Sequence, residues 1–168
     1  ELRVLLDSIP SRKLTVSGMM IVKNEAPRIM ERLNELSQFC DDIVVVDTGS
    51  TDNTVQLVKE FGGRIKPRLF NYFWIDDFSA ARNFAKTQCA GDWIFWLDGD
   101  DHLEPVSIEA LKDFPNWKSH QTRKLDAIKF PCVMGDTWGF QFRIFKNLET
   151  IKWQGEYHET VDDSVEQG

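Results

Sequence analysis

The chain has 168 residues and a mass of 19.5 kDa, which fits a single globular domain. Hydrophobic residues make up 42% of it and charged residues 28%, so we expect a packed core and exclude wholesale disorder. Lys and Arg total 20 against 27 Asp and Glu, a formal charge of -7. That balance argues against a nucleic-acid-binding surface and permits an acidic pocket for a cation.

No run approaches the ~18 apolar residues of a membrane-spanning helix, and no signal peptide is visible. The chain begins with Glu1 rather than Met, so we expect it to be a piece of a longer protein or a trimmed form. Cys40, Cys89 and Cys132 are odd in number and fit neither a metal-binding CxxC pattern nor a disulfide framework. We expect reduced thiols in a cytoplasmic domain.

The first half of the chain alternates strand-like and helix-like stretches. Residues 14–22 form an apolar run that predicts a strand, and residues 43–46 form a continuous β-branched run typical of a buried parallel strand. Between them, Pro27 suits the first turn of a helix. A second helix is expected to follow the turn residues 47–54 and to end at Phe61.

The pattern continues with a weaker strand over residues 64–70 and a third helix capped by Asp77 or Ser79. Residues 93–97 predict a fourth strand, and a fourth helix is expected over residues 105–111. Such alternation predicts an α/β fold, with a mostly parallel sheet flanked by helices on both faces.

After residue 116 the pattern changes. Residues 127–133 and 139–145 predict two further strands, which we expect to pair antiparallel in a small C-terminal part.

Polar residues follow three of the predicted strands directly. They occupy residues 23–25, 47–53 and 98–101. Because ligands of open α/β sheets bind outside the carboxyl ends of the strands, these loops predict one binding site.

The last of these loops holds three carboxylates, Asp98, Asp100 and Asp101, around Gly99. Like charges this close repel one another unless a cation neutralises them, and hard oxygen ligands suit Mg²⁺ or Mn²⁺. The alternative is a solvated acidic turn that caps the next helix.

Other candidates are equally open to two interpretations. Asp47 either binds a base or ribose or caps the helix that starts near Asp52, and Asn24 and Glu25 carry the same ambiguity. Arg82 either faces a diphosphate or is an ordinary surface residue.

Two histidines adjoin acidic residues. His158 and Glu159 pair a good metal ligand with a plausible general base, although a surface pair is the usual case. His102 is expected in the first turn of a helix.

These residues together resemble the family-2 glycosyltransferases of GT-A fold. The resemblance rests on Met-Ile-Val-Lys-Asn-Glu at 20–25, Ile-Val-Val-Val-Asp-Thr-Gly-Ser-Thr-Asp-Asn-Thr at 43–54, Phe-Ser-Ala-Ala-Arg-Asn at 78–83 and Trp-Leu-Asp-Gly-Asp-Asp at 96–101. The motifs stand in the family's order and cover about residues 15–105. Residues 153–159 also resemble the end of the catalytic module in a bacterial branch.

The resemblance implies a single GT-A, Rossmann-like domain over residues 1–168. Within it, residues 14–105 would be the nucleotide-binding half and residues 106–160 a shortened acceptor-side half, with 161–168 a loose tail.

It also implies an inverting transfer of a sugar from a nucleotide diphosphate donor, most often a UDP-sugar, with Mn²⁺ or Mg²⁺. By position, Asp47 would contact the uracil, and the loop of Asn24 and Glu25 would line the base pocket. Asp98 would lie by the ribose, and Asp100 would hold the metal.

Arg82 would help to bind the nucleotide, and His158 would complete the metal or diphosphate site. The family's usual base motif is not recognisable, so Glu159 is the first candidate for the general base and Asp136 the second. Thr48 also replaces an Asp that is frequent in the family.

Other functions stay open. A non-catalytic nucleotide-sugar-binding module, or a truncated fragment, would show the same motifs. A nucleotidyltransferase would want a Gly-rich basic first loop, which is absent here, and a dehydrogenase would want GxGxxG.

The resemblance leaves the acceptor open among a saccharide, a lipid-linked group and a protein. It fits a role in cell-envelope polysaccharide synthesis in the cytoplasm, including the inner face of the membrane. No basic amphipathic helix supports membrane association.

Overall fold

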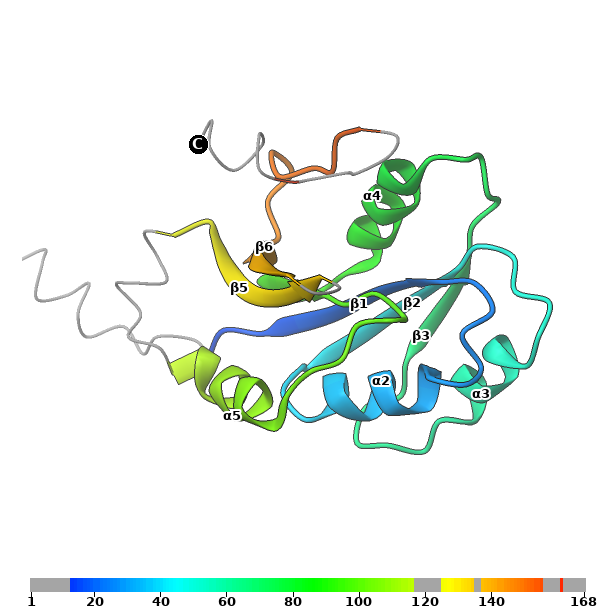
Figure 1. Ribbon diagram of the computed structural model, residues 1–168, viewed down its shortest axis with the longest axis horizontal. Helices are drawn as coiled ribbons and strands as arrows, with labels where there is room; N and C mark the ends of the chain where they lie inside the picture. The colour runs from blue at the N-terminus through cyan, green and yellow to red at the C-terminus, as the bar shows by residue number, and fades with distance from the viewer. Residues whose placement is uncertain (1–12, 117–124, 135–136, 156–160, 162–168) are drawn as a thin grey trace, which may run out of the picture.

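The computed structural model describes residues 13–116, 125–134, 137–155 and 161. Its sheet has six strands in the order β3-β2-β1-β4-β6-β5 (Figure 1). The strands are β1 (Val16–Val22), β2 (Asp42–Asp47), β3 (Arg68–Asn71), β4 (Trp93–Trp96), β5 (Ala127–Met134) and β6 (Thr137–Lys146). The helices are α2 (Ile29–Ser37), α3 (Thr54–Glu60), α4 (Phe78–Gln88) and α5 (Pro105–Asp113), followed by the 3₁₀ turn Phe114–Asn116.

The predicted α/β class is confirmed. Strands β1, β2, β3 and β4 pair in parallel, so their carboxyl ends lie at one edge of the sheet. The β5–β6 hairpin is antiparallel, as expected. The sequence did not indicate that β6 pairs with β4, which makes the hairpin part of the main sheet.

Helices cover both faces of the sheet, as the alternating pattern predicted. Helices α2, α3 and α5 lie on one face and α4 on the other (Figure 1). The α2 side chains Ile29, Leu33 and Leu36 are fully buried on the first face. On the second face, Ala85 of α4 packs in one cluster with Trp153, which follows β6.

Local chemistry fixes where the helices begin. The Asp77 carboxylate accepts a hydrogen bond from the Ala80 N–H at 2.9 Å, so Asp77 rather than Ser79 caps α4. Pro105 opens α5, where its missing N–H costs no hydrogen bond. Pro27 lies two residues before α2 rather than inside its first turn.

Val161 is the one described residue of the tail predicted to be loose, and it is buried. The rest of that tail lies outside the described residues. No helix in the described part of the chain is both long enough and apolar enough to cross a bilayer.

Replacing Leu33 with Ala should lower the free energy of unfolding by about 2–5 kcal/mol, because it leaves a cavity beneath α2. Met30→Ala is the matched control: Met30 lies on the same helix but is 37% exposed, and its replacement should change stability by less than about 0.5 kcal/mol. Urea denaturation of both variants measures the difference. Equal losses would contradict this packing of α2.

Candidate functional site

A cavity of about 290 Å³ lies at the carboxyl ends of the parallel strands. Its described lining residues are Ile21, Val22, Lys23, Glu25, Thr48, Phe78, Arg82, Asp98, Gly99 and Asp100. We call it the strand-end pocket. Four of the residues predicted to form the site border it: Glu25, Arg82, Asp98 and Asp100.

Hydrogen bonds join the loops after β1 and β2. The Thr48 backbone N–H and hydroxyl both donate to the Val22 carbonyl, at 2.9 and 3.1 Å. The Asn24 side-chain oxygen accepts from the Thr51 N–H at 2.7 Å, and Asn24 itself adopts a left-handed φ of 59° that Asn tolerates. The Asn24 side chain therefore holds the neighbouring loop in place.

Asp47 is buried, and its carboxylate stabilises the turn that follows β2. The carboxylate accepts hydrogen bonds from the Gly49 N–H at 3.1 Å and from the Ser50 N–H at 3.1 and 3.2 Å. Asp47 is not among the described residues lining the strand-end pocket. The alternative that Asp47 caps the next helix is wrong, because Asp52 is the residue that accepts from the Thr54 N–H, at 2.9 Å.

Glu25 and Gly99 are in close contact across the strand-end pocket. A Cβ atom at position 99 would lie 2.4 Å from the carboxyl carbon of Glu25, so only glycine fits there without moving that side chain. Glu25 Oε2 is buried without a hydrogen bond among the described residues. Its nearest cation is Arg28, whose Nη1 lies 3.6 Å away.

Arg82 is a buried residue of the site, which excludes an ordinary surface role. Only 6% of it is exposed, and its Nη2 donates to Asp98 Oδ1 at 2.8 Å. The Arg82 guanidinium therefore brings α4 and the loop after β4 together at the strand-end pocket.

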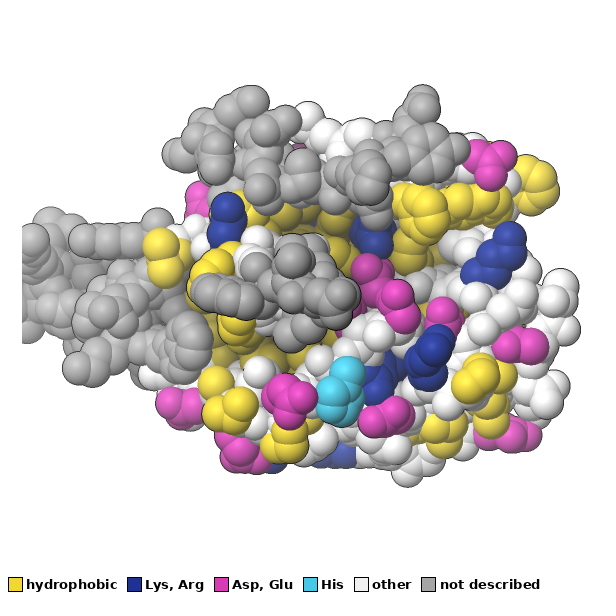
Figure 2. Space-filling model, viewed as in Figure 1, with side chains coloured by type: hydrophobic (Ala, Val, Ile, Leu, Met, Phe, Trp, Pro, Cys, Tyr) yellow, Lys and Arg dark blue, Asp and Glu magenta, His cyan; other side chains and the backbone are white. Residues whose placement is uncertain are grey.

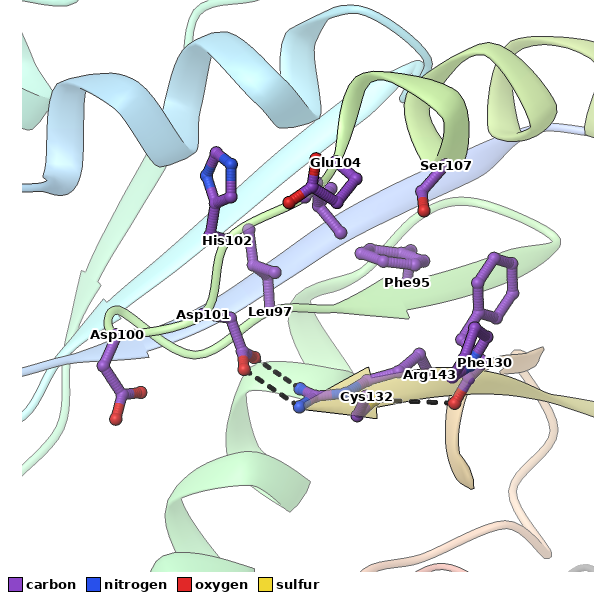
Figure 3. A pocket seen from close by; sticks show the side chains of 12 residues that line it. Phe95, Leu97, Asp100, Asp101, His102, Glu104, Ser107, Phe130, Cys132 and Arg143 are labelled. Atoms are coloured by element: carbon purple, nitrogen blue, oxygen red, sulfur yellow. Dashed lines mark hydrogen bonds and ion pairs between the residues drawn. The ribbon is translucent and has the colours of Figure 1, made fainter. Parts of the chain in front are cut away.

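The loop after β4, residues 98–101, has three carboxylates in different surroundings; we call it the aspartate loop. Asp101 accepts two hydrogen bonds from Arg143, at 2.6 and 3.1 Å (Figure 3). Burial raises the pKa of Asp101 although the Arg143 charge and the Asp98 N–H oppose the shift. Asp100 is exposed and makes no hydrogen bond or ion pair with the described residues.

A second cavity, of about 430 Å³, lies between the aspartate loop, α5 and the β5–β6 hairpin (Figure 3). Phe95, Phe130 and Pro131 give it apolar walls, and Arg143 and Asp101 give it a charged side. Asp100 borders both this cavity and the strand-end pocket.

A second cluster of charged side chains connects α2 to the aspartate loop. Glu31, Glu35 and His102 bring ligand atoms within 4.8 Å of one another. Arg32 supplies the cation there: it pairs with Glu31 at 2.7 Å and with Glu35 at 3.3 Å. Burial raises the pKa of Glu35, and the Arg32 charge opposes that shift.

His102 was expected in the first turn of a helix, and this was wrong. Helix α5 begins at Pro105, so His102 lies in the connecting loop. Its Nδ1 is 3.1 Å from Glu35 Oε1, and Arg32 donates to the backbone carbonyl of Asp101. These contacts fix the loop against α2.

The segment after β6 is attached to α4 close to the strand-end pocket. The Asn83 side chain donates to the Trp153 carbonyl at 3.0 Å and accepts from the Trp153 N–H at 3.0 Å. The Ser79 hydroxyl donates to the Gly155 carbonyl at 2.5 Å. The predicted residues Asp136, His158 and Glu159 lie outside the described residues.

The charged groups gather on one face of the molecule. Figure 2 shows acidic and basic side chains side by side between α4 and α2, with hydrophobic side chains nearer to α4. Chemically, the strand-end pocket offers a buried guanidinium for an anion beside carboxylates for a cation. Asp100, whose oxygens bind none of the described residues, fits a hard divalent cation, and Glu25 Oε2, which has no hydrogen bond to the described part of the chain, adds a further oxygen donor nearby.

The family model described as Glycosyl transferase family 2 matches residues 17–116, more than half of the chain. The chain belongs to glycosyltransferase family 2. The matched region holds the loops of the strand-end pocket, and Arg143 and Trp153 follow it.

Two curated relatives illustrate the proteins that the chain is similar to, and one of them is named as a glycosyltransferase. The chain is 36% identical over 156 residues to a TPR repeat-containing protein of Synechococcus elongatus, covering 89% of the chain and 36% of that relative. It is 33% identical over 101 residues to the lipopolysaccharide core biosynthesis glycosyltransferase LpsC of Rhizobium meliloti, covering 60% of the chain and 37% of LpsC. The chain therefore spans about a third of the length of these relatives.

Solved structures share the fold. S. aureus TarS 1-349 has a TM-score of 0.64 at 19% identity, covering 90% of this chain and 53% of that one. The mannosyltransferase PcManGT of Pyrobaculum calidifontis has a TM-score of 0.57 at 24% identity, covering 70% and 35%. At these identities the likeness shows the GT-A fold.

Sequence reasoning missed Arg143 and Arg32. Arg143 lies on β6, and the hydrophobic pattern of the sequence does not indicate that this strand pairs with β4. Arg32 lies on α2, where a charged residue in the sequence looks like an ordinary surface residue. The acidic loop itself gave the only available signal, because buried carboxylates need cationic partners.

Cys132, which borders the second cavity, should react with a thiol reagent at pH 8 while Cys40 and Cys89 stay protected. Burial raises the pKa of Cys89 to about 12 and that of Cys40 well above its usual value, so neither forms the reactive thiolate at this pH. Mass spectrometry of labelled peptides identifies the site, and labelling of all three cysteines in denaturant is the control. Fast native labelling of Cys40 or Cys89 would contradict this packing.

Proposed function

We propose that this domain binds a nucleotide diphosphate sugar, with UDP-sugars as the first candidates, and transfers the sugar with inversion to an acceptor hydroxyl. The observation that carries the proposal is the strand-end pocket, where Arg82 lies beside Asp98 and Asp100 at the carboxyl ends of parallel strands. A diphosphate needs a cationic group, and a metal that binds it needs carboxylate oxygens.

Structures with the same fold support this donor class. TarS has been crystallised with UDP-GlcNAc, and that complex has a TM-score of 0.52 to this chain. PcManGT has been crystallised with GDP-Man and Mn²⁺. LpsC, named for lipopolysaccharide core biosynthesis, supports a role in cell-envelope polysaccharide synthesis.

Asp100 is the residue we propose to hold Mn²⁺ or Mg²⁺, with Asp98 and Glu25 as the nearest further carboxylates of the strand-end pocket. A bound divalent ion would stabilise the negative charge that develops on the departing nucleoside diphosphate. Arg82 would contribute positive charge to the same end of the donor.

On the opposite side of the sugar, a base must take the proton of the acceptor hydroxyl. Glu159 is our first candidate and Asp136 the second, with His158 beside the diphosphate. The attachment of Gly155 to Ser79 supports Glu159, because four residues reach at most about 14 Å from this anchor near the strand-end pocket. In-line displacement then inverts the anomeric carbon without a covalent enzyme intermediate.

A binding module without turnover is the second candidate. It is favoured by one observation, that the chain spans about a third of its curated relatives. In those relatives an acceptor site can lie in the part that this chain does not match.

UDP with Mn²⁺ should raise the melting temperature of the chain, whereas UDP or Mn²⁺ alone should raise it much less. A ligand at 100 times its dissociation constant stabilises a fold by about 2.7 kcal/mol, which a thermal melt detects easily. GDP, CDP and ADP tested alongside identify the base. Asp100→Ala should abolish the metal-dependent part of the shift, because the metal loses its free carboxylate.

The matched control is Asp113→Ala, which removes an exposed carboxylate from the far end of α5. Its metal-dependent shift should equal that of the wild type. A full shift in Asp100→Ala would move the metal to another residue. No shift of the wild type with any nucleotide would contradict donor binding.

Glu159→Gln should keep metal-dependent UDP binding and lose at least about 100-fold in transfer, because the acceptor hydroxyl loses its base. Transfer is measured as UDP release with a donor and acceptor pair found by screening. Glu149→Gln is the matched control at an exposed position and should transfer at the wild-type rate. Undiminished transfer by Glu159→Gln would assign the base to another residue, with Asp136→Asn tested next.

A further inference from the structure

Trp96 is the last residue of β4 and is separated from the aspartate loop by Leu97. Two arginines pack against its indole ring. The guanidinium carbon of Arg143 is 3.9 Å from the ring centroid, and that of Arg82 is 4.8 Å away. Arg143 comes from β6 and Arg82 from α4. The ring therefore orients two cations that belong to different elements.

Each of these arginines also binds one carboxylate of the aspartate loop. Arg82 holds Asp98 at 2.8 Å, and Arg143 holds Asp101 with two hydrogen bonds of 2.6 and 3.1 Å. The Asp101 carboxylate also accepts from the Asp98 N–H at 2.9 Å, which closes the turn. Asp100 lies between the two held residues in the sequence, and Figure 3 shows its side chain apart from the Arg143–Asp101 pair.

The Trp96 ring is itself held in place. Its Nε1–H donates to the Phe142 carbonyl on β6 at 2.6 Å. The Trp153 ring packs edge-on against it, with the ring centroids 6.0 Å apart. The arginines therefore contact a ring whose position is fixed by β6 and by the segment attached to α4.

We propose that Arg143 is a positioning residue for Asp100, which rests on the proposed role of Asp100 in holding the metal. Arg143 neutralises Asp101 and keeps that carboxylate turned toward β6, so Asp101 does not compete for the cation or repel Asp100. The bidentate contact also fixes the end of the turn that presents Asp100 to the strand-end pocket. A guanidinium suits this task because its planar group can bind a carboxylate with two hydrogen bonds and stack on an aromatic ring at the same time.

The test is a titration of UDP binding with Mn²⁺ by calorimetry, at a temperature where circular dichroism shows each variant folded. Arg143→Met should raise the Mn²⁺ concentration needed for half-maximal UDP binding about 10–100-fold, the range typical of removing a group that lies outside the ligands of a metal site and helps to orient them. Metal-free UDP binding should stay unchanged. Arg143→Lys keeps the charge but not the planar fork, so its Mn²⁺ requirement should fall between those of Arg143→Met and the wild type. It replaces Arg143→Met in the test if that variant fails to fold.

Arg68→Met is the matched control. Arg68 also binds an aspartate through two hydrogen bonds, to Asp42 at 2.6 and 2.9 Å, but it does so at the start of β2 and β3, at the opposite edge of the sheet. Its loss should lower the melting temperature without changing the Mn²⁺ requirement. A merely structural role for Arg143 would give the same result as this control.

A second measurement tests whether Arg143 acts through its contact with Asp101. Asp101→Asn should itself raise the Mn²⁺ requirement, and Arg143→Met combined with it should raise that requirement little further, because both changes break one contact. If the fold-changes in Mn²⁺ requirement of the two single variants multiplied in the double variant, the proposal would be overturned.

The outcomes separate the inference from the proposed function. Wild-type binding that depends on Mn²⁺, together with an unchanged Mn²⁺ requirement in folded Arg143→Met or Arg143→Lys, would overturn the inference alone. A wild-type chain that binds UDP without any dependence on metal would overturn the metal role of Asp100 and the inference with it.

Discussion

The mutual repulsion of the carboxylates in the aspartate loop is the constraint on which the site depends. Three aspartates within four residues repel one another unless cations lie close by, and Asp98 and Asp101 are partly removed from water. The fold places Arg82 beside Asp98 and Arg143 beside Asp101, while Arg32 binds the loop's backbone. These three cations come from α4, β6 and α2, so the packing of the whole domain decides the shape of the loop.

Sheet topology explains how these elements come together. Parallel strands bring the loops after β1, β2 and β4 to one edge, and the antiparallel strand β6 lies beside β4. Because β6 runs in the opposite direction, it carries Arg143 toward the edge at which β4 ends. A further parallel strand in that place would need a crossover connection. The hairpin therefore completes the site as well as the sheet.

The sequence predicted the α/β class, the four parallel strands and the loops that meet at their ends, because burial and alternation are local signals. It also indicated Asp98 and Asp100, since three aspartates follow a buried-looking strand at the edge of the sheet where ligands bind. It could not predict the partners of those residues. The Arg143–Asp101 contact joins residues 42 positions apart. The pairing of β4 with β6, which the sequence did not predict, brings them together. The sequence did predict the start of α5 at Pro105, and that start alone places His102 in the preceding loop.

Much of the family motif supports backbone rather than ligand. Asn24 binds an amide of the neighbouring loop, Asp47 binds amides of its own loop, and Asn83 uses its side-chain amide to hold Trp153. A polar group already bonded to the protein gains little from a ligand, because binding would exchange one hydrogen bond for another. Cation binding therefore falls first to carboxylates of the pocket that have no hydrogen bond to the described residues. Among the described carboxylates of the site, Asp100 and Oε2 of Glu25 lack a hydrogen bond to the described residues, whereas Asn24, Asp47 and Asn83 hold the loops beside them.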